Sequence, residues 1–328
     1  MNDYAEKLTV LMDASLAEVP EDAPVFGARR WLEATAQALP FPLHILKAYK
    51  GETLAAYLPL QSVSRGFLRK AFVPIFTFYG GPYFVGERRK FFSEETKQRY
   101  EILREMLAFL EREFHYCLLL PDGNDVRPAL ERGWTCTPRY TLLNRLKSPD
   151  SLEFNRAAMK NIRKAERLGL RLGESGPGDG FETAFTRTFV RKGLDMAWQP
   201  RWAADLRKAL TGSGLLDNVS VFTAEGKEIA FASVALDREQ STAILWYSCS
   251  LEEADHAGAM HFLYRELMLR YREEFDVFDL CGADHRSLSE FKEKFSQELV
   301  ARHALEKWSG PGARALMGAY ARARALIR

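Results

Sequence analysis

The sequence lacks a charge imbalance, a long hydrophobic run and a cysteine pairing pattern. Its 328 residues include 46 Lys and Arg against 44 Asp and Glu, a formal net charge of +2. No field of the whole molecule therefore attracts nucleic acid or membrane, and a basic site must be local. No segment approaches the roughly twenty consecutive apolar residues that span a bilayer. Residues 1–24 carry acids early and no basic region followed by an apolar one, so we expect no secretory signal there.

Cysteine is scarce and scattered. The sequence has no CxxC pair of the kind that holds a metal or forms a redox motif, only Cys117, Cys136, Cys249 and Cys281. We therefore expect reduced and mostly buried thiols, no metal site, and a cytoplasmic protein that can meet a membrane only at its inner face.

The rest of the composition, 47% hydrophobic and 27% charged, is typical of a soluble globular protein, and the length favours two domains. In the first half, hydrophobic periodicity predicts a helix, a strand hairpin, a third strand, an amphipathic helix, a short buried strand, a short helix and a last strand. These elements cover residues 26–39, 42–63, 71–84, 94–114, 116–121, 125–133 and 134–146. The second half repeats this order from a three-strand meander onward, over residues 218–250, 257–275, 277–282, 288–295 and 299–308.

The two hairpins indicate a duplication. The segments "YKGETLAAYLPL" and "AEGKEIAFASVAL" can be superposed with Gly51 on Gly226 and Leu54 on Ile229. We predict repeats at residues 1–147 and 148–328, with Ser151 in the join as a cap of the helix that follows. Three strands, helix, strand, helix, strand is an α+β order in which an antiparallel meander separates from the later strands and leaves a cleft.

Four segments resemble the FemAB-type peptidyltransferase and acyltransferase superfamily: "MKNIRKAERLGLRL", "YGGP", "FDLCGADHRSLSEFKEKFS" and "ALERGWTCTPRYTLLNRL". The most specific pieces are N-I-R-K-A-E-x-x-G at 161–169 and F-K-x-x-F at 291–295. The resemblance covers nearly the whole chain and implies two tandem GNAT-like domains, each a mixed, mostly antiparallel sheet flanked by helices. In two departures, Ser296 stands where family members often have Gly, and the coiled-coil arm of some tRNA-dependent members is lacking.

The resemblance implies an enzyme that transfers an acyl or aminoacyl group to an amine of a small-molecule or lipid-linked acceptor, such as a cell-envelope precursor. The implied donor is acyl-CoA or aminoacyl-tRNA, used as a co-substrate and not held as a tightly bound cofactor. No Gly-x-Ser-x-Gly or Cys/His signature indicates a covalent acyl-enzyme. The alternative is a catalytically silent tandem GNAT protein that binds a phosphorylated envelope precursor or acts as an assembly partner.

The segment "DHAGAMHF" stands where a GNAT protein carries its phosphate-binding loop, with the pattern Q/R-x-x-G-x-G/A. In that loop, backbone N–H groups and a helix N-terminus bind phosphates. Asp255 replaces the first residue of the pattern and Met260 the last, so only Gly258 remains as a phosphate-binding candidate. The usual mode of CoA binding is therefore not favoured.

Five basic residues form one stripe of the helix expected at the start of the second repeat. They are spaced i, i+4, i+7, i+8 and i+11, at Arg156, Lys160, Arg163, Lys164 and Arg167. One interpretation is a clamp for the phosphates of tRNA, of a nucleotide-linked sugar or of a lipid pyrophosphate. The other is a solvated helix face.

Candidate catalytic residues lie in "CGADHRSLSEFKEKF", after the buried strand at which a GNAT sheet opens. Asp284 and His285 are candidates for accepting the proton of the amine, with helix capping as the alternative for Asp284. The resemblance gives Lys292, the lysine of F-K-x-x-F, a place near the transferred acyl group, where its charge would stabilise negative charge; the alternative is an exposed helix lysine. Tyr247 lies on the strand whose backbone supplies the oxyanion donor in such folds, and is a weaker candidate for substrate contact.

Residues 309–328 combine a Gly/Pro break with a basic amphipathic helix that contains Arg314, Arg322, Arg324 and Arg328. This helix either docks on its own protein or a partner subunit, or makes a peripheral membrane contact that would suit a lipid-linked acceptor. The sequence leaves the oligomeric state open.

Overall fold

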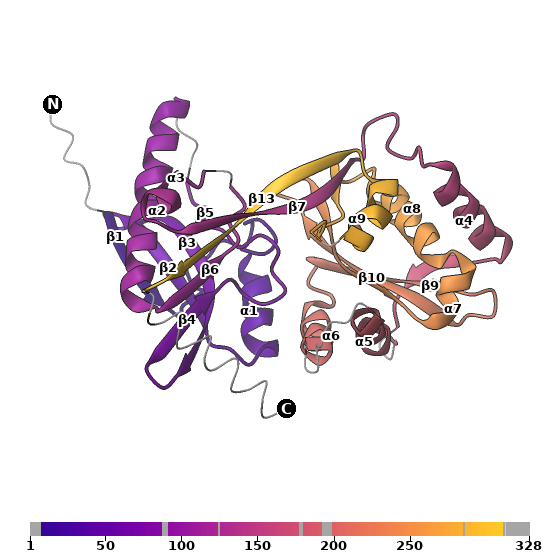
Figure 1. Cartoon of the computed structure of the whole chain (residues 1–328), viewed down its shortest axis with the longest axis horizontal. Helices are drawn as coiled ribbons and strands as arrows, with labels where there is room; N and C mark the ends of the chain where they lie inside the picture. Colours follow the sequence, from indigo (N-terminus) through magenta and orange to yellow (C-terminus); the bar gives the residue numbers. More distant parts are fainter. Residues whose placement is uncertain are drawn as a thin grey trace. The chain divides into compact units, whose positions relative to one another are not determined.

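The computed structural model describes residues 8–86, 91–123, 125–176, 180–191, 199–284, 286–310 and 312. The chain forms two compact units, each a sheet covered by helices (Figure 1). The first unit comprises Met1–Ala36, Pro40–Pro138 and Arg302–Arg328, and the second comprises Gln37–Leu39 and Arg139–Ala301. His285 and the helix expected within residues 313–328 lie outside the described residues.

The sheet of the first unit has the strand order β1-β2-β3-β4-β6-β13, with β5 paired to β3. Its neighbours run antiparallel except β4 and β6, which are parallel. The strands are β1 (Leu8–Asp13), β2 (Leu43–Lys50), β3 (Thr53–Arg65), β4 (Leu68–Phe72), β5 (Tyr83–Phe84), β6 (Tyr116–Leu119) and β13 (Glu298–Trp308). The helices are α1 (Arg29–Ala38), α2 (Phe92–Glu113) and α3 (Arg127–Glu131).

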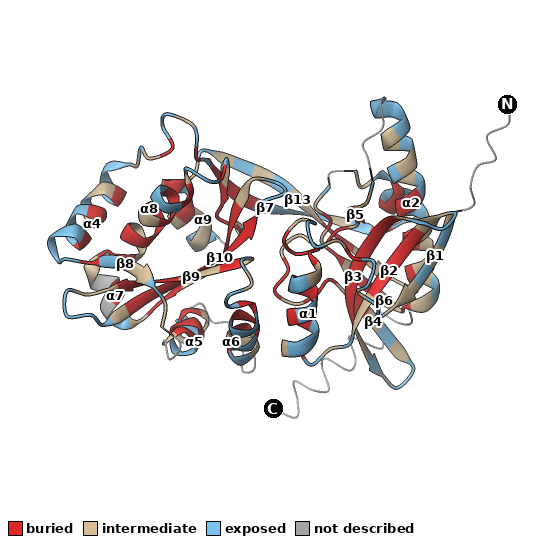
Figure 2. Ribbon diagram, turned by 180° about the vertical axis from the view of Figure 1, so that it is seen from behind, coloured by how far each residue is buried: buried red, intermediate tan, exposed pale blue. Residues whose placement is uncertain are grey.

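The helices α1 and α2 cover opposite faces of this first sheet. Leu107 of α2 packs in one cluster with Leu46 of β2, whereas Leu32 of α1 packs in another with Ile45 and Tyr57. Because adjacent residues of a strand point to opposite faces, Ile45 and Leu46 serve the two different cores. Figure 2 shows the buried strands between these helices.

The sheet of the second unit has the strand order β7-β12-β11-β10-β9-β8. Its neighbours run antiparallel except β11 and β12, which are parallel. The strands are β7 (Thr135–Arg145), β8 (Arg171–Glu174), β9 (Leu216–Phe222), β10 (Glu228–Asp237), β11 (Thr242–Ser250) and β12 (Val277–Asp279). The helices are α4 (Arg156–Arg167), α5 (Phe181–Arg191), α6 (Gln199–Leu210), α7 (Glu252–Ala257), α8 (Ala259–Tyr271) and α9 (Arg286–Lys292), followed by the 3₁₀ turn η1 (Glu293–Phe295).

Helices also cover both faces of the second sheet. Ile162 of α4 and Leu263 of α8 belong to one buried cluster with Val219 of β9. On the other face, the ring of Phe185 in α5 lies 4.9 Å from that of Tyr247 in β11. Figure 1 shows α5 and α6 on one side of β9 and β10, and α4 and α8 on the other.

The α+β fold class is confirmed, and the structure adds elements that the sequence did not predict: β1, α5, α6 and α7. Gly51 and Gly226, superposed from the sequence, occupy the turns of the β2–β3 and β9–β10 hairpins. Both have positive φ, 61° and 86°, which glycine adopts without a β-carbon clash. The duplication seen in the sequence is thus repeated in the conformation of its turns.

The last strand of each sequence half lies in the other half's sheet. β7, which ends the first half, pairs with β12 in the second unit, and β13, which ends the second half, pairs with β6 in the first unit. The compact units therefore divide the chain at residues 138/139 and 301/302, whereas the sequence repeats were set at 1–147 and 148–328. Repeats in the sequence and compact units in space are different divisions of this chain.

Some elements differ from the sequence expectations. The strand expected over 71–84 is divided into β4 and β5, because Pro74 and Pro82 have no N–H to donate to a sheet. The expected cap Ser151 is wrong. Asn155 caps α4 instead, and its side-chain oxygen accepts a hydrogen bond from the Ala158 N–H at 2.8 Å.

Candidate functional site

The sheet of the second unit opens between β11 and β12. These strands pair in parallel only from Thr242 to Ile244 of β11. β11 then runs on to Ser250, whereas the chain after β12 follows β7, where the Leu280 N–H donates to the carbonyl of Leu142 at 2.9 Å. Beyond Ile244 the backbone of β11 thus borders a separation of strands, called here the β11–β12 opening.

A bulge in β11 lies at the same point. Ser233 of β10 lies opposite Tyr247 and Val234 lies opposite Leu245, so Trp246 is the extra residue of the bulge. A bulge bends its strand and increases the local twist. The bulge thus lies just beyond the last residue of β11 that pairs with β12, Ile244.

The chain turns sharply at the end of β12. Cys281 and Gly282 both have positive φ, 53° and 48°, in the left-handed region that residues other than glycine seldom enter. The Cys281 N–H donates to the buried carboxylate of Asp279 at 2.8 Å, and the Thr141 hydroxyl of β7 donates to the same carboxylate oxygen. Asp279 therefore fixes the start of this turn.

Lys292, the last residue of α9, fixes the same turn from the other side. Its side chain is buried, and its ammonium lies 2.7 Å from the carbonyl oxygen of Leu280, 2.5 Å from that of Cys281 and 3.5 Å from that of Gly282. The alternative of an exposed helix lysine is thus wrong. Its expected place near the transferred acyl group stays a prediction.

Asp284 follows this turn and is bound to β7. One of its carboxylate oxygens accepts from Nε of Arg139 at 2.7 Å, and the other accepts from the backbone N–H of Tyr140 at 2.8 Å. These contacts hold the loop after β12 against β7. The role of Asp284 as a base, like that of the undescribed His285, stays a prediction.

Two tyrosines border the β11–β12 opening. Tyr247 lies on β11, and the hydroxyl of Tyr264 in α8 lies 3.0 Å from the hydroxyl of Ser248. Burial raises the pKa of both phenols above its usual range, and the nearby thiol of Cys281 adds to the shift. Both phenols therefore keep their protons at neutral pH and can donate them in hydrogen bonds.

Gly258 begins α8 with φ 72°, in the left-handed region. A β-carbon at this position would lie 2.5 Å from the backbone oxygen of Asn161 in α4. Only glycine lets the start of α8 approach α4 so closely. This contact gives a structural reason for the glycine, and phosphate binding by Gly258 stays a prediction.

His261 lies close to the same contact, and sequence reasoning missed it. Its Nε2 is 3.4 Å from the side-chain nitrogen of Asn161, and its ring packs edge-on against Phe291 at 5.0 Å. Burial, together with the charge of Lys294, lowers the pKa of His261 to about 4. The imidazole is therefore neutral at pH 7, and a histidine followed three residues later by the core position Tyr264 was the signal available in the sequence.

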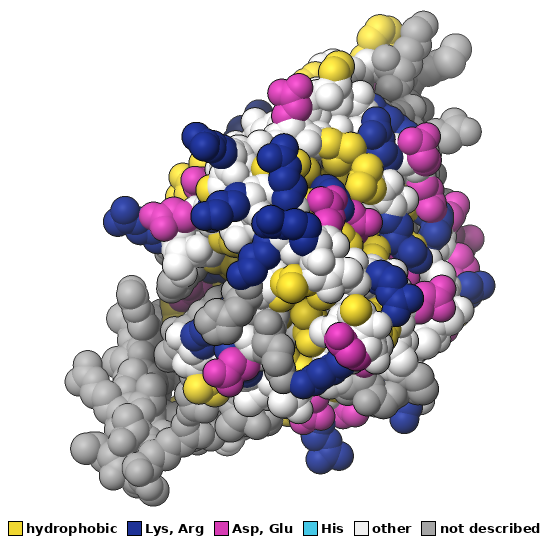
Figure 3. Space-filling model, turned by 90° about the vertical axis from the view of Figure 1, so that its right-hand side faces the viewer, with side chains coloured by type: hydrophobic (Ala, Val, Ile, Leu, Met, Phe, Trp, Pro, Cys, Tyr) yellow, Lys and Arg dark blue, Asp and Glu magenta, His cyan; other side chains and the backbone are white. Residues whose placement is uncertain are grey.

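The basic stripe of α4 is brought together as predicted, on the side of the helix away from the core. All five members are exposed, and none forms an ion pair with another described residue: Arg156, Lys160, Arg163, Lys164 and Arg167. Glu166, the one acid of this helix, is paired with Arg265 of α8. Figure 3 shows basic side chains gathered over one part of this face of the molecule, with few acidic ones among them.

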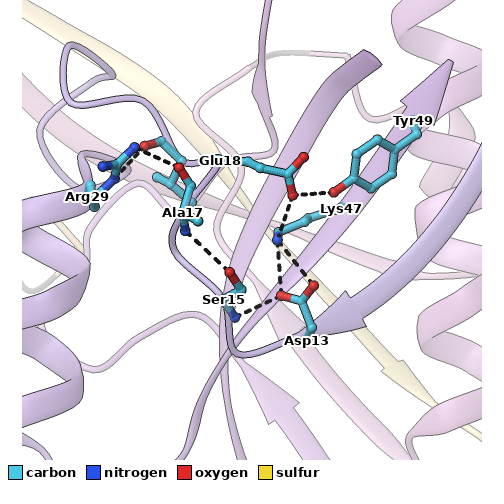
Figure 4. Close-up of polar contacts among 8 residues, drawn as sticks. Asp13, Ser15, Ala17, Glu18, Arg29, Lys47 and Tyr49 are labelled. Atoms are coloured by element: carbon cyan, nitrogen blue, oxygen red, sulfur yellow. Dashed lines mark hydrogen bonds and ion pairs between the residues drawn. The ribbon is translucent and has the colours of Figure 1, made fainter. Parts of the chain in front are cut away.

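An ionic cluster around the buried Lys47 in the first unit was also missed. The ammonium of Lys47 in β2 lies 3.1 Å from Asp13 and 3.0 Å from Glu18, while the hydroxyl of Tyr49 donates to Glu18 at 2.6 Å (Figure 4). Lys47 is 1% exposed. The sequence signal was its position two residues after Ile45, on an apolar face of a strand.

The described residues contain no group of three or more His, Cys, Asp and Glu side chains that could hold a metal ion. Among the helices that the structure describes, none has the length and hydropathy needed to cross a bilayer.

No family model matches the sequence, and no curated protein matches it either. Solved structures are similar in fold. FemX has a TM-score of 0.64 at 13% identity, over 86% of this chain and 91% of FemX. The C-terminal domain of a putative lysylphosphatidylglycerol synthetase from Agrobacterium fabrum has a TM-score of 0.57 at 13% identity, over 92% of this chain and 93% of that domain.

A tandem GNAT protein from the clavulanic acid biosynthesis pathway has a TM-score of 0.54 at 14% identity, over 93% of this chain and 99% of that protein. These three likenesses extend over both halves of the sequence. The fold that they share with this chain is that of the GNAT proteins, in its tandem, FemAB-like form.

Proposed function

We propose that this protein is an acyltransferase that forms an amide on an amino-bearing acceptor, a small molecule or a lipid-linked cell-envelope precursor. The observation that carries the proposal is the β11–β12 opening, where a bulged strand parts from its parallel neighbour inside an acyltransferase fold. Backbone N–H groups along such a strand can stabilise the oxyanion that forms when an amine attacks a carbonyl.

The proposed reaction needs one proton donor and one proton acceptor. The amine nitrogen bonds to the carbonyl carbon, the carbonyl electrons move to oxygen, and the bond to the donor's oxygen or sulfur breaks as the carbonyl re-forms. The leaving atom takes a proton, which we assign to the phenol of Tyr247, and the nitrogen loses one to the solvent or to a nearby base. Tyr247 suits this part because burial keeps its phenol protonated.

Aminoacyl-tRNA is the donor that we propose over acyl-CoA. The segment before α8 has Asp255 and Met260 at the first and last positions of the GNAT phosphate-binding pattern, and close packing on Asn161 accounts for its glycine, Gly258. The α4 stripe extends over roughly 16 Å at 1.5 Å per residue, which exceeds one pyrophosphate and suits the repeated phosphates of a nucleic acid. One structural neighbour is named for a product that contains a lysyl group, which accords with an aminoacyl donor.

The energetics of α4 support an anionic partner. Like charges at i+3 and i+4 destabilise an isolated helix by about 0.2–0.5 kcal/mol per pair. The stripe contains several such pairs, among them Arg156 with Lys160 and Arg163 with Arg167. Because Arg156 also lies at the helix N-terminus, the helix dipole opposes it. A bound phosphate backbone would offset both terms.

Charge reversal in the stripe tests the donor. We expect Lys160→Glu with Arg163→Glu to weaken binding of aminoacyl-tRNA about tenfold or more, and to lower the salt dependence of log K by roughly two, because phosphate contacts release counterions. The melting temperature should stay near that of the wild type. Fluorescence anisotropy over a salt series measures both quantities, and transfer of labelled aminoacyl or acyl groups to amine acceptors compares the donors.

The matched control reverses Arg201 and Lys208, two exposed cations of α6. This pair should leave tRNA binding unchanged. Equal losses in both double variants would indicate a nonspecific effect of net charge, and unchanged binding in the α4 variant would exclude the stripe as the tRNA site.

A further inference from the structure

The peptide groups around Cys281 are held at both ends by buried charges. The Cys281 N–H donates to Asp279, which is 1% exposed, and the Cys281 carbonyl accepts from Lys292, which is 6% exposed. Between these two contacts the backbone of Cys281 has a φ of 53°, which must be held by its surroundings.

We infer that Lys292 is a positioning residue. It holds Cys281 and Gly282 in the left-handed conformation and so fixes the β12 side of the β11–β12 opening, without contacting the substrate. Where it concerns a substrate, this inference rests on the proposed function; where it concerns the turn, it stands on the contacts alone.

The N–H groups of the Lys292 ammonium are directed at backbone carbonyl oxygens. An ammonium has three N–H donors, and three consecutive carbonyls, those of Leu280, Cys281 and Gly282, surround it. A β-carbon on Gly282 would lie 3.7 Å from Nζ of Lys292, so the turn follows the ammonium closely. Direct contact with a transferred acyl group would require the lysine to leave one of these carbonyls.

Cys281 of this turn lies near both tyrosines. Burial is the main reason that the pKa of the Tyr247 and Tyr264 phenols is raised, and Cys281 adds to the shift. A turn released by loss of Lys292 would move this thiol and change the surroundings of the proposed proton donor. Lys292 would then act on the reaction through its neighbours.

Thiol labelling tests the inference without any substrate. Cys281 is 4% exposed, and Cys249, in the same unit, is 2% exposed. In Lys292→Met we expect Cys281 to react with N-ethylmaleimide about tenfold faster than in the wild type, because the turn opens locally, while Cys249 stays protected. Peptide mass spectrometry after timed labelling of the full chain gives both rates.

Cys249 serves as the internal control for global unfolding. Parallel increases at Cys281 and Cys249, or an unchanged rate at Cys281, would overturn the inference. Lys292→Arg keeps a charged donor and is expected to hold Cys281 within about threefold of the wild-type rate. If Cys281 in Lys292→Arg reacted as fast as in Lys292→Met, the result would also contradict the inference.

Transfer kinetics supply the second readout. We expect Lys292→Met to lower kcat with little change in KM, since no substrate contact is lost, and Lys292→Arg to restore most of kcat. An inactive Lys292→Arg whose Cys281 is still protected would place the lysine in contact with substrate and refute the positioning role. If no donor supports transfer at all, the proposed function fails while the labelling result still decides the inference.

Discussion

Lys47 and Lys292 are both buried, although lysine is rarely buried unless it is paired. Lys47 meets the carboxylates of Asp13 and Glu18, whereas the contacts described for Lys292 are with backbone carbonyls. A carboxylate can lose its charge by protonation, but a carbonyl cannot. Acid should therefore weaken the ion pairs of Lys47, whereas the carbonyl contacts of Lys292 do not titrate.

Glu18 allows this difference to be measured. Hydrogen bonds from Tyr49 and Lys47 hold the pKa of Glu18 below its usual range. Its contribution to stability is therefore present above the unfolded pKa of about 4.3 and is lost as the pH falls through the lower folded value. We expect Glu18→Gln to reduce the free energy of unfolding by about 0.5 kcal/mol at pH 7, because Glu18 is 47% exposed and solvent screens its contacts, and the difference from wild type to narrow below about pH 4. Urea titrations at pH 7 and pH 3 measure it.

Glu21→Gln is the matched control, because Glu21 lies on the same segment and its described ion pairs, with Arg29 and Arg30, lie at the surface. Its effect at pH 7 should be smaller. Removing both carboxylates around Lys47, with Asp13→Asn and Glu18→Gln, should cost about 3–5 kcal/mol, because a buried ammonium then lacks a counter-charge. A double variant as stable as the wild type would contradict this account.

At the residue scale, the sequence predicted which residues share a helix face better than which residues contact one another. The spacing of the α4 cations was sufficient to place them on one exposed stripe, because helical geometry alone decides it. The described contacts of Lys292 are with backbone carbonyls. The turn that places these carbonyls around it could not be predicted from the residue types. Asp284 meets Arg139, 145 positions earlier in the chain, and only the pairing of β7 with the second sheet brings them together.

At the scale of elements, the packing of α4 on α8 depends on one glycine. We expect Gly258→Ala to lower the free energy of unfolding by about 3 kcal/mol, since it combines the strain of positive φ, about 1–2 kcal/mol, with overlap on the Asn161 backbone. Urea unfolding with matched m-values gives the cost.

Gly226→Ala separates the two terms of this prediction. Gly226 also has positive φ, 86°, but nothing lies within 4 Å of its β-carbon position. The substitution Gly226→Ala should lower the free energy of unfolding by only about 1–2 kcal/mol. Equal costs at the two glycines would show that the helix contact adds nothing, and would weaken the case against pyrophosphate binding at the start of α8.

Among elements, strongly periodic segments were predictable and others were not. α2 and the β2–β3 hairpin are recognisable because their apolar residues repeat with the period of the element. α5 was not predicted, because its sequence "FETAFTRTFVR" is rich in aromatic and β-branched residues, which have low helix propensity. β12 has three residues, too few to show an alternating apolar pattern. It matters to the site because its end lies at the β11–β12 opening.

At the scale of the whole molecule, the exchange of β7 and β13 makes each half of the sequence incomplete. β13 pairs with β6, and its Leu305 is buried in the core of the first unit. We expect residues 1–147 alone to show no cooperative thermal unfolding, because the edge of β6 and part of that core lack cover. Circular dichroism on heating tests the fragment.

Restoring the strand is the control for this experiment. A single chain in which residues 298–310 are linked to residues 1–138 should regain a cooperative transition, since it contains every described strand of the first sheet. A cooperative transition of residues 1–147 without β13 would show that the first repeat folds independently. The exchange itself was not predictable, because an alternating pattern gives the two faces of a strand but not its neighbours.

The strand exchange also sets an order of events during synthesis. Arg302 of β13 binds Asp122 of the first unit, 180 positions earlier in the chain. A ribosome must therefore finish almost the entire second half before the first sheet can close. Until then the nascent chain presents the open edge of β6, and this is where a chaperone is most useful to the growing protein.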